Sequence, residues 1–92
     1  MNRVTLRIPV PLQEFTGGRE TLTVGGNSVR EVLAAAGEAN PGLLARILTP
    51  EGERRPFVNV FVGETNVRQM QDLDTPVSDG DEVHVIAAVA GG

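Results

Sequence analysis

The stretch "EVHVIAAVAGG" (residues 82–92) joins an apolar strand pattern to two glycines. Its alternate apolar positions, which can face a helix, are Val83, Val85 and Ala87. A period of two residues is typical of a half-buried β-strand, and the length of this one predicts a central place in a sheet. Gly91 and Gly92 cannot contribute packing, so we expect a rigid strand followed by a flexible Gly-Gly tail.

A second strong strand pattern is "FVNVFV" (residues 57–62). Its two alternating sets differ in polarity, because an asparagine falls among the phenylalanines. The set that we assign to the core is Val58, Val60 and Val62. The set that we assign to the open face of the sheet is Phe57, Asn59 and Phe61. Two interpretations of the phenylalanines are open: a second small core under the loops, or a partner-binding face.

The first part of the chain predicts two further strands, "VTLRIPV" (residues 4–10) and "ETLTVGG" (residues 20–26). Both alternate apolar and polar residues, and prolines end the first of them. Between them, "PLQEFTGGRE" (residues 11–20) predicts a loop or wide hairpin that turns at its glycine pair.

The middle of the chain predicts two helices. Ser28 and Glu31 have the spacing of a capping box, and Gly37 suits the position just after the helix end. A second, short helix is expected within "NPGLLARIL" (residues 40–48), because proline favours a helix start. The segment "TPEGERRP" (residues 49–56) then predicts an exposed charged loop.

The predicted order is strand, strand, helix, short helix, strand, strand. In a chain of 92 residues this order predicts one α+β domain, a roll in which the main helix lies across one face of a mixed sheet. Six prolines, eleven glycines and only three aromatic residues leave little material for a deep catalytic pocket. We therefore expect a protein that is not an enzyme.

Charge and composition exclude several classes of function. The net charge of −4 argues against nucleic acid and anionic membranes as partners, since both require clustered cations. No apolar stretch approaches the about 20 residues of a membrane span, and the polar start does not resemble a signal peptide, so we expect a cytoplasmic protein. All eight basic residues are arginine. Two explanations are open: codon bias in a GC-rich genome, or the avoidance of nucleophilic lysine amines.

Local motifs predict no metal site. The chain has no cysteine, and its single histidine, His84, is expected to be a half-exposed strand residue. In "SDGDEV" (residues 78–83) the two aspartates flank Gly80, and this pattern favours a tight turn over a metal site. The glycine pairs also lack the strand-to-helix setting of a nucleotide-binding loop.

Taken together, the pieces resemble the ubiquitin-like sulfur-carrier family (ThiS/MoaD-like). The stretches that carry the resemblance are "VTLRIPVPL", "TGG", "GNSVREVL", "RPFVNVFVGETNVR", "SDGDEVHVIAAV" and the final "AGG". The resemblance implies a β-grasp (ubiquitin-like) fold over residues 1–88 and a flexible tail over residues 89–92.

The resemblance also implies a chemistry. An E1-like enzyme would adenylate the carboxylate of Gly92 with ATP, and a sulfur donor would then convert it to a thiocarboxylate. The tail that enters the active sites of partners would be Val89, Ala90, Gly91 and Gly92. The family implies no cofactor bound by the carrier itself, because ATP is used by the activating enzyme.

Within the family, "RPFVNVFVGETNVR" and "AVAGG" are most similar to carriers of cysteine biosynthesis. That similarity implies a PLP-dependent cysteine synthase as sulfur acceptor and a metallopeptidase that releases cysteine from the tail. Three alternatives are open. The sulfur can serve molybdopterin, thiamine or another metabolite; the protein can be a ubiquitin-like modifier conjugated through Gly92; or it can be a plain binding module that does not use its C-terminus.

Overall fold

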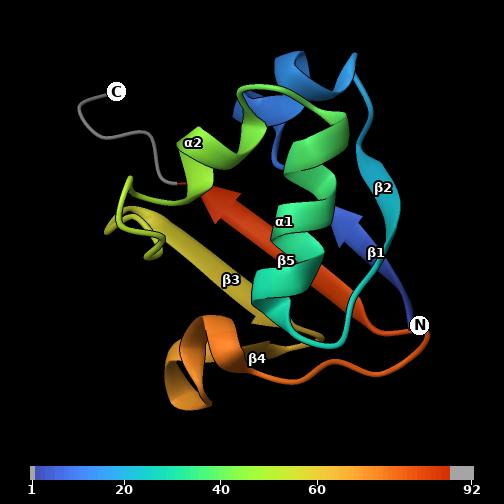
Figure 1. The fold of residues 1–92 in the computed structure, drawn as a ribbon, viewed down its shortest axis with the longest axis vertical. Helices are drawn as coiled ribbons and strands as arrows, with labels where there is room; N and C mark the ends of the chain where they lie inside the picture. The colour runs from blue at the N-terminus through green and yellow to red at the C-terminus, as the bar shows by residue number, and fades with distance from the viewer. Residues whose placement is uncertain (1, 88–92) are drawn as a thin grey trace.

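The computed structural model describes residues 2–87, which form one sheet with helices against one of its faces (Figure 1). The strands are β1 (Arg3–Arg7), β2 (Thr21–Gly25), β3 (Val58–Val62), β4 (Thr65–Asn66) and β5 (Glu82–Ala87). The helices are α1 (Val29–Ala39) and α2 (Leu43–Ile47), with the 3-10 helices η1 (Val10–Thr16), η2 (Val67–Gln69) and η3 (Asp72–Asp74). Within residues 2–87, none of these helices has the length and apolar character needed to cross a membrane.

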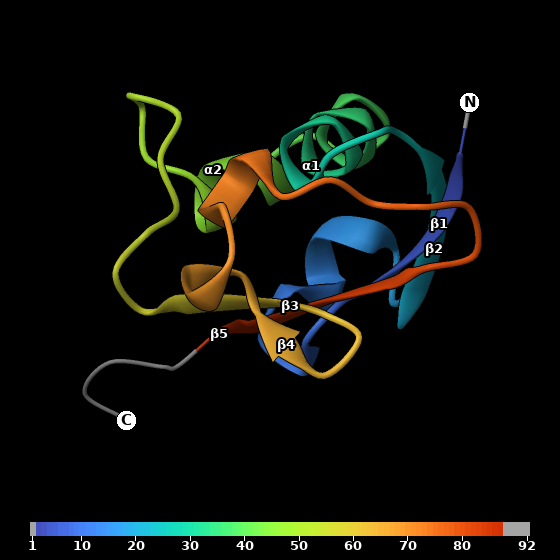
Figure 2. The same cartoon turned by 90° about the horizontal axis from the view of Figure 1, so that it is seen from below.

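The sheet has the strand order β2-β1-β5-β3-β4, so β5 is its central strand, as the sequence predicts. β5 runs parallel to β1 and antiparallel to β3, which makes the sheet mixed. In Figure 2 the two α-helices lie on one side of the sheet. The predicted α+β roll, with its main helix across one face of a mixed sheet, is therefore confirmed.

The core lies between the sheet and α1. Val58 and Val60 of β3 are 3% and 0% exposed, and Val83 and Val85 of β5 are 0% and 3% exposed. The assignment of the valine set to the core is confirmed, with Val62 partly buried against it. These side chains also fix the register, because a shift by one residue would turn them to the opposite face.

The start of α1 follows the predicted capping box. The backbone N–H of Glu31 donates to Ser28 Oγ over 3.2 Å. The Glu31 carboxylate accepts from the backbone N–H of Asn27 over 2.9 Å, one residue before the expected donor. Two N–H groups that the helix itself cannot pair are thus satisfied.

The predicted end of α1 at Gly37 is wrong, because the helix continues to Ala39. Gly37 instead faces α2: a Cβ atom at this position would lie 2.8 Å from Leu44 Cβ. The missing side chain therefore allows close contact between the two helices.

The connection between β1 and β2 is also more ordered than the predicted loop. Residues 10–16 form η1, and Leu12 and Thr16 on it are buried. The Thr16 hydroxyl lies 3.1 Å from the carbonyl oxygen of Gln13 and 2.9 Å from that of Arg19. Burial of an apolar side chain and these local hydrogen bonds convert the expected loop into a packed turn of helix.

Candidate functional site

The end of β5 is paired with β3 in the sheet. Its last residue, Ala87, pairs with Val58 at the start of β3, and the ladder between the two strands continues to Val83. The Ala87 side chain is partly buried against the core. The predicted tail residues Val89, Ala90, Gly91 and Gly92 lie outside the described residues, as does the expected boundary after residue 88. The described part therefore shows a strand that is paired and packed up to Ala87.

The predicted partner-binding face is only partly open. Phe57 lies just before β3 and is 59% exposed, whereas Asn59 and Phe61 are half-buried on β3. None of the three belongs to the buried core, and the exposure of Phe57 argues against a second small core around it. The binding role of these residues stays a prediction.

The neighbouring strand β5 adds an apolar residue that the sequence analysis missed. Ile86 is 50% exposed and pairs with Asn59 across the ladder, while His84 pairs with Phe61. The alternation that places Val83 and Val85 in the core also places Ile86 on the opposite face. The period of β5 could therefore have identified it.

A small polar cluster borders this face. Arg7 Nε lies 2.7 Å from Glu82 Oε1, and His84 Nε2 lies 3.3 Å from the same oxygen. The hydrogen bond and positive charge of Arg7 hold the pKa of the Glu82 carboxyl below its usual value. His84 is half-exposed, as predicted.

The motif at residues 78–81 is the predicted turn. Gly80 has φ +87°, and the backbone N–H of Asp81 donates to the Ser78 carbonyl over 3.0 Å. Asp81 Oδ2 accepts from the N–H of Ser78 over 2.8 Å, and Asp79 Oδ1 from the N–H of Arg3 over 2.7 Å. The carboxylates therefore bind backbone N–H groups, and residues 2–87 contain no cluster of three or more metal-ligating side chains.

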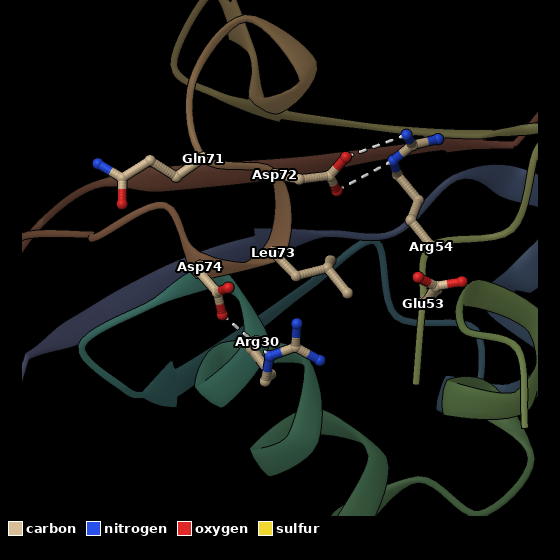
Figure 3. A pocket seen from close by; sticks show the side chains of 7 residues that line it. All are labelled: Arg30, Glu53, Arg54, Gln71, Asp72, Leu73 and Asp74. Atoms are coloured by element: carbon tan, nitrogen blue, oxygen red, sulfur yellow. Dashed lines mark hydrogen bonds and ion pairs between the residues drawn. The ribbon is translucent and has the colours of Figure 1, made fainter. Parts of the chain in front are cut away.

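The sequence predicts that residues 49–56 form an exposed charged loop. This prediction is only partly right, because one arginine of the segment is largely buried. The Arg54 side chain is 13% exposed and binds Asp72 through Nε and Nη2, at 3.3 and 3.1 Å (Figure 3). Its Nη1 also donates to the carbonyl oxygen of Val58 over 2.9 Å. Arg54 thus binds the backbone of the first residue of β3, next to Phe57.

The same arginine lines a hollow of about 350 Å³ that Figure 3 shows from close by. Arg30, on α1, lies across it and pairs with Asp74 at 3.2 Å. Both arginines thus face carboxylates. The ion pairs at this hollow connect α1, η3 and the segment before β3.

The arrangement can present the chain after Ala87 to another molecule, next to a surface that contains Phe57, Phe61 and Ile86. Comparison with known proteins gives this geometry a context. A model of the ThiS family matches residues 6–92 of the chain. The sulfur carrier protein CysO of Mycobacterium tuberculosis is 34% identical over 91 residues, which cover 97% of this chain and 98% of that protein.

Solved structures agree with these matches. A chain in the crystal structure of the Amycolatopsis orientalis BexX/CysO complex has a TM-score of 0.90 and 35% identity, and covers 97% of this chain and 99% of its own. The solution structure of small archaeal modifier protein 1 (SAMP1) from Methanosarcina acetivorans has a TM-score of 0.87 and 26% identity, with coverage of 100% and 98%. The β-grasp fold that the sequence implies is thereby confirmed.

Proposed function

This chain belongs to the ThiS family and is a sulfur carrier protein, and we propose that it carries sulfur as a thiocarboxylate at Gly92 for cysteine biosynthesis. The observation that carries the proposal is the family match, which extends to residue 92. The pairing of Ala87 with Val58 supports it, because this ladder holds the last described residue of β5 in the sheet.

The chemistry follows from the properties of a carboxylate. A C-terminal carboxyl group has a pKa of about 3.5 and is an anion at neutral pH, which makes it a poor electrophile. Attack of its oxygen on the α-phosphorus of ATP forms an acyl adenylate and releases pyrophosphate. A sulfur nucleophile then forms a bond to the acyl carbon, and AMP leaves with the electron pair. Since the chain has no cysteine, no side-chain thiol competes for the sulfur.

Glycine at the reactive end suits this chemistry. A narrow channel that leads to ATP admits backbone but not bulky side chains, and a residue without Cβ can extend or turn at the carbonyl without a clash. Gly91 and Gly92 therefore fit the active site of an adenylating enzyme, which is E1-like in the family.

Measurement of the intact mass would test the carrier function. The purified protein is incubated with an adenylating enzyme, ATP and a sulfur source, and should gain the mass of one oxygen-to-sulfur exchange. Fragmentation should place the added mass on Gly92. An added mass on another residue, or no gain with several adenylating enzymes, would contradict the proposal.

The acceptor reaction is the step that is specific to cysteine. The ionised, polarisable sulfur of the thiocarboxylate adds to the aminoacrylate that a PLP-dependent synthase forms from phosphoserine, since PLP supplies the electron sink. The product is a thioester, and the neighbouring cysteine amine then takes the acyl group through a five-membered transition state. A metallopeptidase that cuts the resulting amide releases cysteine and restores the carboxylate of Gly92.

The acceptor assay compares two pathways. The purified thiocarboxylate is offered to a cysteine synthase with phosphoserine, in competition with a molybdopterin precursor and its synthase large subunit. We expect a carrier that is one cysteine heavier, with the amide at Gly92. Delivery of sulfur to the pterin alone would contradict the cysteine assignment and leave the carrier function intact.

The similarity to SAMP1 supports a second candidate, conjugation of Gly92 to other proteins. Both candidates use adenylation and differ in the product. Mass spectrometry of cell extracts should find the free protein and its thiocarboxylate if the chain is only a carrier. An isopeptide bond from Gly92 to lysines of other proteins would establish a modifier, and trypsin would leave residues 69–92 on those lysines because Arg68 is the last arginine of a chain without lysine.

A further inference from the structure

The end of β5 lies close to two other segments. Val58 pairs with Ala87, so residues 55–57 lie beside the point where β5 ends. Figures 1 and 2 both place α2 and the segment before β3 at this end of the molecule. These two segments are therefore neighbours of the end of β5.

Three arginines from three segments gather here: Arg46 on α2, Arg55 before β3 and Arg68 on η2. Arg55 Nε donates to the carbonyl oxygen of Ala45 over 2.8 Å. Arg68 Nη2 donates to the carbonyl oxygen of Pro56 over 3.3 Å. We call these three arginines the basic collar.

The basic collar has no internal counter-charge in the described part of the chain. The ion pairs that arginines form within residues 2–87 use Arg7, Arg30 and Arg54, and none uses a collar arginine. Arg46 instead stacks its guanidinium over the ring of Phe15, 5.1 Å from the ring centre. These contacts orient the three side chains without neutralising their charge.

A hollow of about 550 Å³ separates two members of the collar. Its lining is Phe15, Gly42, Ala45, Arg46 and Arg55, which includes no carboxylate. The hollow in Figure 3 differs, because its arginines face Asp72 and Asp74. Uncompensated cations around an open hollow are a surface for anions.

The position of the collar selects the kind of anion. The five residues after Ala87 span at most about 17 Å when fully extended. When the Gly92 carboxylate reaches ATP deep in an enzyme, the collar on the folded domain stays at the mouth of the channel. Its natural counterpart there is a protein surface rich in aspartate and glutamate, because charge complementarity across an interface guides approach and orientation.

We propose that Arg46, Arg55 and Arg68 dock an acidic surface that surrounds the active-site opening of the adenylating enzyme. This inference rests on the proposed function and adds the residues and the charge of the contact. Because the overall charge is −4, an acidic enzyme surface would repel most of this protein and attract the collar, which favours one orientation of approach. The collar thus directs the tail end of the molecule toward the enzyme.

The test measures adenylation kinetics with the enzyme used in the mass assay, at low and high salt. The triple variant R46Q/R55Q/R68Q should raise the KM for the carrier on the order of tenfold at low salt and leave kcat unchanged. High salt should reduce this difference, because screening weakens contacts between exposed charges. The double variant R46Q/R68Q, which leaves half-buried Arg55 in place, should show a smaller increase and controls for folding.

The matched control is Arg3→Gln, which removes one charge at the opposite end of β1 and β5. It should leave the KM unchanged. An unchanged KM in the triple variant, or an equal increase in Arg3→Gln, overturns the inference while the wild-type protein is still activated. Faster activation of the triple variant also overturns it, since the arginines would then restrain the chain's own carboxylate. Failure of wild-type activation contradicts the proposed function itself.

Discussion

The two ends of β5 use their polar groups differently. At the start of the strand, Asp79 and Asp81 bind backbone N–H groups, and Glu82 pairs with Arg7. At the other end, Arg55 keeps its charge unpaired among the described residues, and Phe57 is 59% exposed. The polar side chains at the start of the strand bind other groups of the domain. The side chains at the other end are available to another molecule.

This difference predicts a separation of effects. Substitutions at the start of β5 should change stability and leave activation intact, because their partners lie within the domain. Substitutions at the other end should change activation with little loss of stability. Measuring stability and activation on the same variants tests this separation.

The largest effect is expected at the tail itself. One residue added after Gly92 should abolish thiocarboxylate formation, because the carboxylate that reacts with ATP would be displaced. The melting temperature should stay within error, since terminal residues contribute little packing. Intact mass and thermal melting check the two parts, and deletion of Gly92 should behave in the same way. Full activation with the blocked tail would contradict the proposed function.

A smaller effect on activation is expected at Phe61. Phe61→Ala should weaken binding to the adenylating enzyme by about 1 to 2 kcal/mol if the open face contacts it. Titration calorimetry with the enzyme measures the affinity. Phe61→Leu, which keeps apolar bulk, is the matched control and should retain more affinity. Unfolding of Phe61→Ala would show that the half-buried ring serves the core instead.

A substitution in the turn before β5 should lower stability and leave activation unchanged. Gly80 has φ +87°, which is strained for residues with a side chain, and a Cβ there would meet nothing within 4 Å. Gly80→Ala should therefore lower the free energy of unfolding by about 1 kcal/mol through the backbone alone. Gly80→Asn should lose less, because asparagine tolerates this conformation. Chemical denaturation measures both free energies, and slower activation at an unchanged melting temperature would contradict the separation of effects.

Much of the fold follows from local patterns. The period of two placed Val58, Val60, Val83 and Val85 in the core, and the chemistry of Ser28 predicted the start of α1 correctly. What failed depends on contacts between distant residues. Gly37 continues the helix and serves as a contact for Leu44, which a helix-end rule cannot anticipate.

The surface near the end of β5 was hard to predict from the sequence. Arg54 binds Asp72, 18 positions away, so its burial could not be inferred from the charged segment around it. The basic collar joins three segments that are separate in sequence, and no spacing rule connects them. Ile86 is different, because the alternation of β5 could have identified it, although the sequence analysis missed it.

The smallest effect concerns the ion pair at the start of β5. Arg7 lowers the pKa of Glu82 mainly through its hydrogen bond to the carboxylate, so the folded protein holds this proton less tightly than the unfolded chain. The stability from this pair is therefore present above the unfolded pKa of about 4.3, and is lost as the pH falls through the lower folded value. Glu82→Gln should slightly lower the melting temperature at neutral pH and reduce its decline on acidification, with activation unchanged. The exposed Glu64→Gln, on the loop between β3 and β4, is the matched control. A pH profile in which Glu82→Gln declines as steeply as the wild type would show that the contact contributes nothing to the fold, and the start of β5 would then resemble its tail end.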